Sequence, residues 1–419
     1  MYENLGNDQF LDVSEASGLD DNGKTWTTIA IDLNNDGYLD LYLANDFGPN
    51  KLYINNGDKT FTENTAAYGL EDPYEGMGLA IADCDGNGYF DIYLTNVTEM
   101  GFDQQINKLF LNTGNSLFIN KSVEAGVSLA GWGWGTEFFD LENDGDEDLF
   151  VGNGYFSQVF ANRFFRNDTD SDSVHFEEIA VNLGLADTSE ARGVAVFDYN
   201  DDGHSDLIVS NFTKSPSLYE NSISEGNWLK IKLEGTVSNR DAFGTTVELQ
   251  ANGESYKKYH HGAQFLGQNI VPLHFGLNDI QLIEKIIVKW TNGNIEEFSD
   301  VDVNQTILIK EGSGIVSNVN EITRNLATQP DEIKLSGNYP NPFNSSTNIQ
   351  FEISVAGEIE IKIFNTLGQT VKEIKEYYSS NGEKTISLIF GDKTCSGFYF
   401  YKINLKNGIS KVGKMLLVK

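Results

Sequence analysis

Three-residue apolar runs recur through the first half of the chain, and each is apolar on both faces. They stand on either side of short acidic segments that contain glycine. A run without a polar face is typical of a strand buried between neighbouring sheets. The runs before the acidic segments are 29–31, 79–81 and 194–196, and the runs after them are 41–43, 92–94, 149–151 and 207–209. The pattern predicts a series of small antiparallel sheets, with an acidic segment at the turn of each central hairpin.

The acidic segments are four copies of one loop, which begin at nearly even intervals at Asp32, Asp83, Asp140 and Asp198. A phenylalanine and a glycine precede every copy at a fixed spacing: Phe10 and Gly18, Phe61 and Gly69, Phe118 and Gly126, and Phe176 and Gly184. Regular recurrence of a unit of this size is the signature of a repeat architecture. Units of several strands pack radially into a β-propeller; the β-solenoid, the main competing architecture, usually has shorter repeats.

Each loop places oxygen-bearing side chains at positions 1, 3, 5 and 9 and a glycine at position 6. Calcium takes six to eight oxygen ligands, here with a backbone carbonyl at position 7, and the glycine permits the sharp turn around the ion. Magnesium fits less well because it demands stricter octahedral geometry. The predicted calcium ligands are Asp32, Asn34, Asp36, Tyr38 and Asp40; Asp83, Asp85, Asn87, Tyr89 and Asp91; Asp140, Glu142, Asp144, Asp146 and Asp148; and Asp198, Asn200, Asp202, His204 and Asp206.

Two other structures share parts of this loop pattern. An EF-hand opens in the same way but has a glutamate at position 12, where these loops have Leu43, Leu94, Val151 and Val209. Its flanks are also helices, so we exclude an EF-hand. Asp, Asn and Gly form ordinary polar turns as well, and a single loop would not distinguish such a turn from a metal site. Four copies at matched positions favour the metal.

The loops and their spacing match FG-GAP or VCBS-type propeller repeats, a resemblance that covers roughly residues 1–221. This resemblance implies a β-propeller whose loops bind calcium. The second loop departs slightly from the pattern, with Gly86 at position 4 and Asn87 at position 5, so its affinity is less certain.

From Asn227 onward, alternating strand patterns replace the acidic loops. The segment contains Trp228–Leu233, His274–Leu277 and Val288–Gly293, and two Asn-Gly pairs, at 252–253 and 292–293, predict type I′ hairpin turns. It resembles the ASPIC/UnbV domain, which follows such repeats in relatives of cartilage acidic protein.

The C-terminal part of the chain forms a further β-rich segment. It opens with Asn338–Asn344 and includes Ile359–Phe364, Gly397–Tyr401 and Lys414–Lys419. The segment resembles the type A C-terminal sorting domain of type IX secretion, which implies export and attachment at the cell surface. An ordinary immunoglobulin-like tail domain is the alternative.

The predicted fold class is all-β: a partial β-propeller of calcium-binding repeats followed by two small β-sandwich-like domains. We expect four full blades and the tail of a preceding one in residues 1–225, and the ASPIC/UnbV domain in 226–311. A linker is expected in 312–334, where periodicity is lost, and the sorting domain in 335–419.

Composition narrows the class of partners. The 419 residues carry 29 Lys and Arg against 62 Asp and Glu, a net charge of −33, which argues against a nucleic-acid binder. No apolar run reaches the ~18 residues of a membrane-spanning helix. Two cysteines, Cys84 and Cys395, do not make a disulfide framework. The start is polar and repeats the spacing of residues 53–57, so we expect an N-terminal truncation that lacks a signal peptide and upstream blades.

No catalytic motif of a hydrolase, a zinc protease or a nucleotide-binding enzyme is present. The adjacent pair His260 and His261 is expected at a surface. One further candidate is a ring of residues that stand six positions before the four loops, namely Trp26, Met77, Trp134 and Arg192. Near a channel mouth such a ring would contact sugars or peptides; packing between blades is the simpler alternative.

These observations favour a secreted or cell-surface, non-enzymatic binding or adhesion protein that binds calcium and is exported by the type IX machinery. Its ligand would be an extracellular glycan or protein. The alternative is a calcium-dependent polysaccharide-active enzyme, a lyase or hydrolase, on a propeller scaffold. A third possibility, an accessory role in secondary metabolism, is suggested only by the UnbV half of the domain name.

Overall fold

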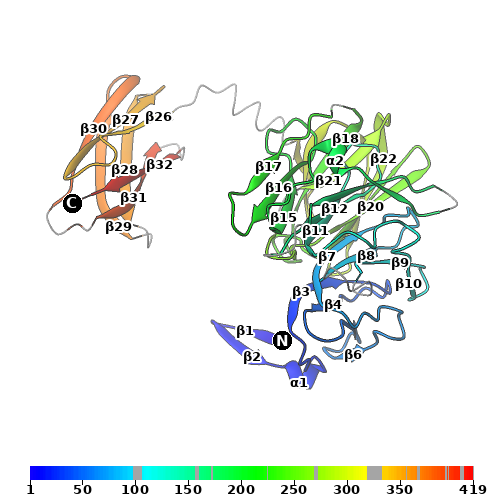
Figure 1. Cartoon of the computed structure of the whole chain (residues 1–419). Coiled ribbons are helices and arrows are strands. Elements are labelled where there is room, and N and C mark those ends of the chain that lie inside the picture. Colours follow the sequence, from blue (N-terminus) through cyan, green and yellow to red (C-terminus); the bar gives the residue numbers. More distant parts are fainter. Residues whose placement is uncertain are drawn as a thin grey trace. The chain divides into compact units, whose positions relative to one another are not determined.

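The computed structural model describes residues 1–97, 106–155, 160–170, 173–223, 225–268, 272–318, 333–354, 356–365, 369–391, 394, 396–405 and 410–418. The chain divides into two compact units, Met1–Val319 and Asn320–Lys419, and each is described by itself (Figure 1). The described regular structure is almost all strand, with two short helices, α1 (Ser14–Ser17) and α2 (Ala180–Leu183). The predicted all-β class is therefore confirmed. Within the described residues, no helix is long and apolar enough to cross a membrane.

Four small antiparallel sheets, in which the strands follow one another in chain order, make up the repeat region. A hairpin of β1 (Tyr2–Gly6) and β2 (Gln9–Asp12) precedes them. The sheets are β3 (Thr25–Ile31), β4 (Asp40–Asn45), β5 (Lys51–Asn55) and β6 (Phe61–Glu63); β7 (Gly76–Ala82), β8 (Asp91–Asn96), β9 (Lys108–Asn112) and β10 (Phe118–Asn120); β11 (Gly133–Phe139), β12 (Asp148–Asn153), β13 (Arg163–Asn167) and β14 (Phe176–Glu178); and β15 (Ala191–Phe197), β16 (Asp206–Asn211) and β17 (Ser217–Tyr219).

Successive sheets pack side by side as the blades of a partial β-propeller. Their first strands are neighbours, since β7 contacts both β3 and β11, and β11 contacts β15. Apolar side chains fill each interface; Tyr42 of the first blade and Leu79 of the second belong to one buried cluster, as do Phe150 of the third blade and Val194 of the fourth. All residues of β8 and of β12 are buried, which explains why their sequences have no polar face.

A two-layer sandwich follows the blades within the first unit. One sheet has the order β21-β18-β24-β25 and the other β20-β19-β22-β23. Between the sheets lies a core that includes Leu229, Val247, Phe275 and the fully buried Trp290. The strands are β18 (Asn227–Glu234), β19 (Thr245–Ala251), β20 (Glu254–His260), β21 (Leu273–Asn278), β22 (Leu282–Lys289), β23 (Ile295–Asp302), β24 (Gln305–Lys310) and β25 (Gly314–Asn318).

The segment expected to be a linker, 312–334, is partly structured. The chain reverses at Gly312 and Gly314, both with positive φ, so that β25 pairs antiparallel with β24. The segment also contains the start of β26, and residues 319–332 of it lie outside the described residues. The short apolar pair Ile315-Val316 is too brief a pattern to have indicated an edge strand.

The second unit is a separate β-sandwich. Its sheets have the orders β26-β27-β30 and β29-β28-β31-β32. Alternate residues of β27, such as Ile349 and Phe351, enter the core with Ile361 and Ile403 from the facing sheet. The strands are β26 (Ile333–Tyr339), β27 (Ser346–Ile353), β28 (Gly357–Asn365), β29 (Thr370–Tyr378), β30 (Gly382–Ile389), β31 (Gly397–Leu405) and β32 (Ser410–Leu417).

Candidate metal sites

Each acidic loop joins the first strand of its blade to the second and is closed by its own side chains. In the first loop, the first carboxylate, Asp32, accepts hydrogen bonds from the backbone N–H groups of Asp36 and Gly37, both at 3.0 Å. Asp140 and Asp198 accept the matching pair of bonds in the third and fourth loops. The backbone thus folds the loop around the first carboxylate, as the glycine at position 6 predicted.

The ninth residue of every loop is a buried aspartate that begins the second strand. Asp40 accepts hydrogen bonds from the N–H groups of Leu33 (3.1 Å) and Asn55 (2.9 Å). In the other blades, the ninth residue accepts the same two bonds. One comes from the N–H of loop position 2, and the other from the N–H of an asparagine at or just after the end of the third strand. Burial nevertheless raises the pKa of Asp40 to about 7, so the site disfavours the negative charge when no cation is nearby.

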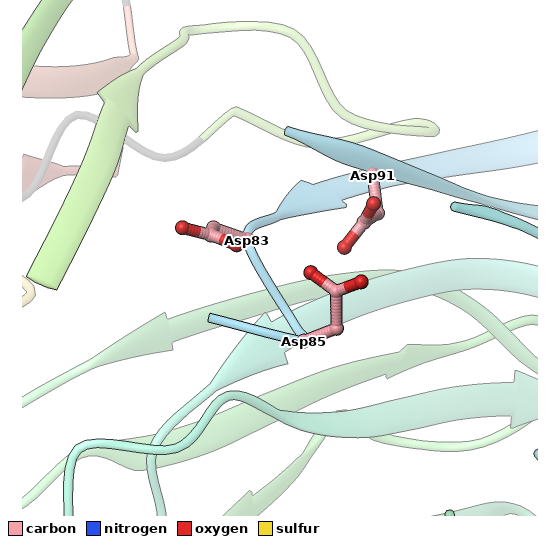
Figure 2. Close-up of side chains that lie close together, drawn as sticks. All are labelled: Asp83, Asp85 and Asp91. Carbon is pink, nitrogen blue, oxygen red and sulfur yellow. The ribbon is translucent and has the colours of Figure 1, made fainter. Parts of the chain in front are cut away.

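The second loop brings three carboxylates together. One ligating oxygen from each of Asp83, Asp85 and Asp91 can be chosen so that all lie within 4.8 Å of one another. Figure 2 shows Asp85 and Asp91 with their carboxylates turned toward one another and Asp83 beside them. Burial raises the pKa of Asp83 to about 6 and that of Asp91 well above its usual range.

An orphaned oxygen in this loop supports a cation. Asp83 Oδ1 is buried and has no hydrogen-bond partner among the described residues. The equivalent oxygen in the other loops accepts the N–H of position 5, but here the N–H of Asn87 binds Asp85 instead, at 3.2 Å. One lone-pair site on Asp83 therefore stays open among the described residues. A hard cation would satisfy it and relieve the mutual repulsion of the three carboxylates.

The third loop has the highest density of negative charge. Its carboxylates at positions 1, 3, 5 and 9 are joined by Asp146 and Glu147. Glu142 Oε2 is buried without a partner among the described residues, and burial together with Asp144 raises the pKa of Glu142. Burial also raises the pKa of Asp146 to about 6. Among the described residues, however, three carboxylates gather within 4.8 Å of one another only in the second loop.

The two tyrosines at position 7 pack against neighbouring hairpins, which leaves their carbonyls as the predicted metal ligands. Tyr38 packs against Gly57 and Tyr89 against Gly114, in the hairpins that join the third and fourth strands. His204 Nδ1 lies 3.0 Å from the side-chain nitrogen of Asn143. In each loop, the N–H of position 7 donates to the side chain of position 5; for example, the N–H of Tyr38 donates to Asp36 Oδ1 at 2.8 Å. The donor set that remains for a metal is oxygen only, which suits calcium.

Four lysines from the sandwich 227–318 reach the four loops, one to each. Lys289 Nζ lies 3.6 Å from Asp32 Oδ2 in the first loop, and Lys257 donates to the carbonyl of Gly88 at 2.7 Å in the second. Lys258 pairs with Glu147 in the third loop, and Lys230 pairs with Asp198 in the fourth. The sandwich therefore covers the loop end of the blades.

The motif His274–Leu277 anchors the sandwich on the third loop. His274 Nε2 lies 2.6 Å from Asn143 Oδ1, and the N–H of Asn278 donates to the carbonyl of Asn143 at 2.7 Å. Gly276 passes so close to Asp140 Oδ2 that a side chain at this position would collide with it. Tyr259 adds a hydrogen bond to the carbonyl of Ala30 in the first blade. Sequence patterns gave no sign of these contacts, because they join strands that are far apart in the chain.

The ring of residues six positions before the loops is partly covered: Met77 is buried, whereas Trp26 stays 49% exposed. Phe265, from the segment between β20 and β21, lies 5.8 Å from Trp26 and 5.6 Å from Trp134 between ring centroids, and it shares a buried cluster with Met77. Arg192 stacks over Trp134 at 4.1 Å. The structure therefore brings these positions together, as the repeat predicted, but around a side chain of the sandwich.

The histidine pair also differs from the expectation of a surface position. His260 is 9% exposed, stacks on Phe243 and lies 3.0 Å from the carbonyl of Asp241. Burial lowers its pKa to about 4. His261 Nδ1 lies 3.1 Å from the carbonyl of Ala263. β20 ends at His260, and the chain continues from there into the segment that carries Phe265.

An asparagine that the sequence analysis did not assign links neighbouring blades. Asn167 Nδ2 donates to the carbonyl of Cys84 in the second loop at 2.9 Å, and Asn221 Nδ2 donates to the carbonyl of Leu141 in the third at 2.8 Å. Asn112 makes the matching bond to the first loop at 3.5 Å. An available signal was the aromatic residue two positions before each of these asparagines.

Three family models match separate parts of the chain. An FG-GAP-like repeat model matches residues 32–94, an ASPIC and UnbV model matches 235–316, and a secretion system C-terminal sorting domain model matches 338–419. Among curated proteins, cartilage acidic protein 1 of Xenopus tropicalis is 28% identical over 267 residues, and the human protein of that name is 27% identical over 272 residues. Both matches cover 61% of this chain but only 40% and 39% of the relatives.

Similarities to solved structures are weak. Dimeric latent PorU from Porphyromonas gingivalis aligns with 90% of this chain and 31% of that chain, at 11% identity and a TM-score of 0.18. The BBS1N chain in complex with ARL6DN aligns with 94% of this chain and 92% of that chain, at 9% identity and a TM-score of 0.25. Scores this low add nothing to the description of the fold.

The blades and their loops define a repeat protein of the FG-GAP type with an all-β fold. More particularly, the chain combines FG-GAP-like repeats, an ASPIC/UnbV domain and a type IX C-terminal sorting domain. A sorting tail of this kind marks an exported protein that is extracellular or held at the cell surface.

Proposed function

We propose that the protein is a calcium-binding, non-enzymatic binding or adhesion module, exported by the type IX machinery through its C-terminal domain. Its ligand is an extracellular glycan or protein. The observation that carries the calcium assignment is the second loop, where three carboxylates converge within 4.8 Å and Asp83 Oδ1 is buried without a partner among the described residues. Since three other loops repeat the spacing, the proposal extends to four ions.

Calcium binding at these loops would stabilise the first unit selectively. A site whose dissociation constant is 100-fold below the calcium concentration stabilises the folded state by about 2.7 kcal/mol. Several such sites together would be comparable with the whole stability of a domain, ~5–15 kcal/mol. The second unit has its own core and none of the four loops, so it serves as an internal control.

The test is calorimetry of the full chain with calcium and with a calcium chelator, together with metal analysis of the folded protein. We expect the transition of the first unit to move to lower temperature in chelator while the second transition stays in place. Bound calcium should approach four ions per chain. Identical melting in both conditions, with no bound calcium, would contradict the metal assignment.

The binding role requires a separate assay, because calcium sites also occur in enzymes. Arrays of glycans and extracellular proteins should show binding that is lost in chelator. A panel of polysaccharides incubated with the calcium-loaded protein should show no cleavage. Calcium-dependent cleavage of any polysaccharide would replace the binding role with the polysaccharide-active enzyme.

A further inference from the structure

The ASPIC/UnbV domain presents one cation to each acidic loop. The four lysines come from three strands, β18, β20 and β22, yet each reaches a different loop. Four separate contacts of one kind are too regular to reflect general attraction between a basic and an acidic surface. The match between four lysines and four loops needs a local explanation.

Charge counting gives that explanation. Positions 1, 3, 5 and 9 carry three carboxylates in the first, second and fourth loops and four in the third. A calcium ion neutralises two of these charges and leaves one or two. One lysine then balances the charge of the ligand positions in the first, second and fourth loops, although Asp201 adds a further negative charge to the fourth. The loops are thus matched to a divalent ion and a lysine together.

The lysines lie outside the metal cage. Lys230 contacts Asp198 Oδ2, the oxygen that also accepts the N–H of Gly203 at 2.7 Å, while Asp198 Oδ1 accepts the N–H of position 5. Lys289 approaches Asp32 on the same oxygen, Oδ2. Lys258 binds position 8, and Lys257 binds the carbonyl of position 6, neither of which is a predicted ligand. Two lysines thus approach a position-1 carboxylate and two approach groups that are not predicted ligands, so each adds a positive charge beside its loop.

We propose that these lysines set the calcium affinity of the loops. This inference rests on the proposed function and names the residues that tune its sites. A fixed positive charge behind a ligating carboxylate repels the ion, so it weakens binding and shifts filling of the loops to higher calcium concentration. Extracellular calcium modules operate with dissociation constants of about 10⁻⁴–10⁻³ M. By thermodynamic linkage, calcium in turn weakens the electrostatic hold of the ASPIC/UnbV domain on the blades.

The fourth loop offers a site-specific readout. The indole of Trp228 packs directly on Gly203, and Lys230 lies 4.7 Å from the centre of the Trp228 ring. Terbium binds in calcium sites and emits when a nearby tryptophan is excited, so Trp228 would report on this loop. Displacement of terbium by calcium then measures the calcium affinity of the fourth loop in the full chain, and Trp228→Phe should remove this signal.

The decisive comparison is between two lysines on one strand. Lys230→Met should tighten calcium binding in the fourth loop by roughly tenfold, equivalent to about 1.4 kcal/mol. Lys232→Met, at an exposed position two residues along β18, should change it less than twofold. Lys230→Arg, which keeps the charge, should behave as the parent protein.

Lys230 is buried, so its replacement also tests the local packing, and a variant at a second loop provides an independent measurement. Lys289 is 42% exposed, and Lys289→Met should tighten calcium binding by a few-fold in a calorimetric titration of all sites. Calcium affinity that is unchanged or weaker in both Met variants would overturn the role of the lysines while leaving calcium binding intact. If the parent protein binds neither calcium nor terbium, the proposed function fails as well.

Discussion

Asp85→Asn is expected to stabilise the first unit without calcium and to lose most of that gain when calcium is bound, because the weaker binding offsets it. Asp85 stands at position 3 of the second loop, where its ligating oxygen lies within 4.8 Å of those of Asp83 and Asp91. The first loop has Asn34 at this position, and the asparagine oxygen still accepts the N–H of position 5 at 3.0 Å. The substitution therefore removes a charge from a loop geometry that already accommodates asparagine.

The size of the effect follows from the distances between the carboxylates. Two unit charges 4.8 Å apart repel by about 3.5 kcal/mol at an effective dielectric constant near 20. Asp85 takes part in two such pairs, but salt and partial protonation relieve much of this repulsion; burial already raises the pKa of Asp85. We expect Asp85→Asn to stabilise the metal-free first unit by about 1–2 kcal/mol. With calcium, loss of a charged ligand should weaken binding by about tenfold, which costs about 1.4 kcal/mol.

The assay is urea unfolding of the full chain in chelator and in saturating calcium, followed by a signal from the first unit. Asp302→Asn, an exposed position on β23 away from the loops, is the matched control and should be neutral in both conditions. A gain as large in calcium as in chelator would refute the reasoning, because it would mean that Asp85 does not contribute to calcium binding.

The remaining predictions concern the ASPIC/UnbV domain. Gly276→Ala should destabilise the first unit by about 1–3 kcal/mol in urea unfolding, since the new Cβ would lie 2.6 Å from Asn143 Cα and also meet Asp140. Glu311→Gln should cost about 2 kcal/mol at neutral pH, because the carboxylate accepts the N–H groups of residues 236–238 at 2.8 Å each. Burial would raise the pKa of Glu311, but these bonds hold it at about 2, below its unfolded value. Its contribution is therefore full only above its unfolded pKa of 4.5 and disappears as the pH falls toward 2, so parent and variant should converge in acid-unfolding curves.

The repeat region was predictable because short segments of the sequence determine its strands and loops. Buried second strands such as Leu149–Val151 carry their apolar pattern in three residues, and the loops repeat at matched positions. The histidine pair shows where local patterns fail, because adjacent residues in a strand were taken to imply exposure. The segment after His260 enters the blades instead, and only the complete fold reveals that Phe265 lies among Trp26, Met77 and Trp134.

Contacts between the domain and the loops could not be predicted for a related reason. Lys230, Lys257 and Lys289 look like ordinary polar residues of alternating strands, and their partners belong to blades that come much earlier in the chain. The asparagines at or just after the ends of the third strands were only partly predictable. Their position is visible as a repeat, but the bond from Asn167 to the second loop depends on how two blades pack.

That bond has a consequence for how the array responds to a missing part. Because Asn167 and Asn221 each grip the loop of the blade before them, the shape of one loop depends on the neighbour that comes later in the chain. In a repeat array, stability depends on each repeat and on its interfaces with the repeats directly beside it. Damage to one blade should therefore disturb mainly the loop of the blade before it, and hardly at all a loop two blades away.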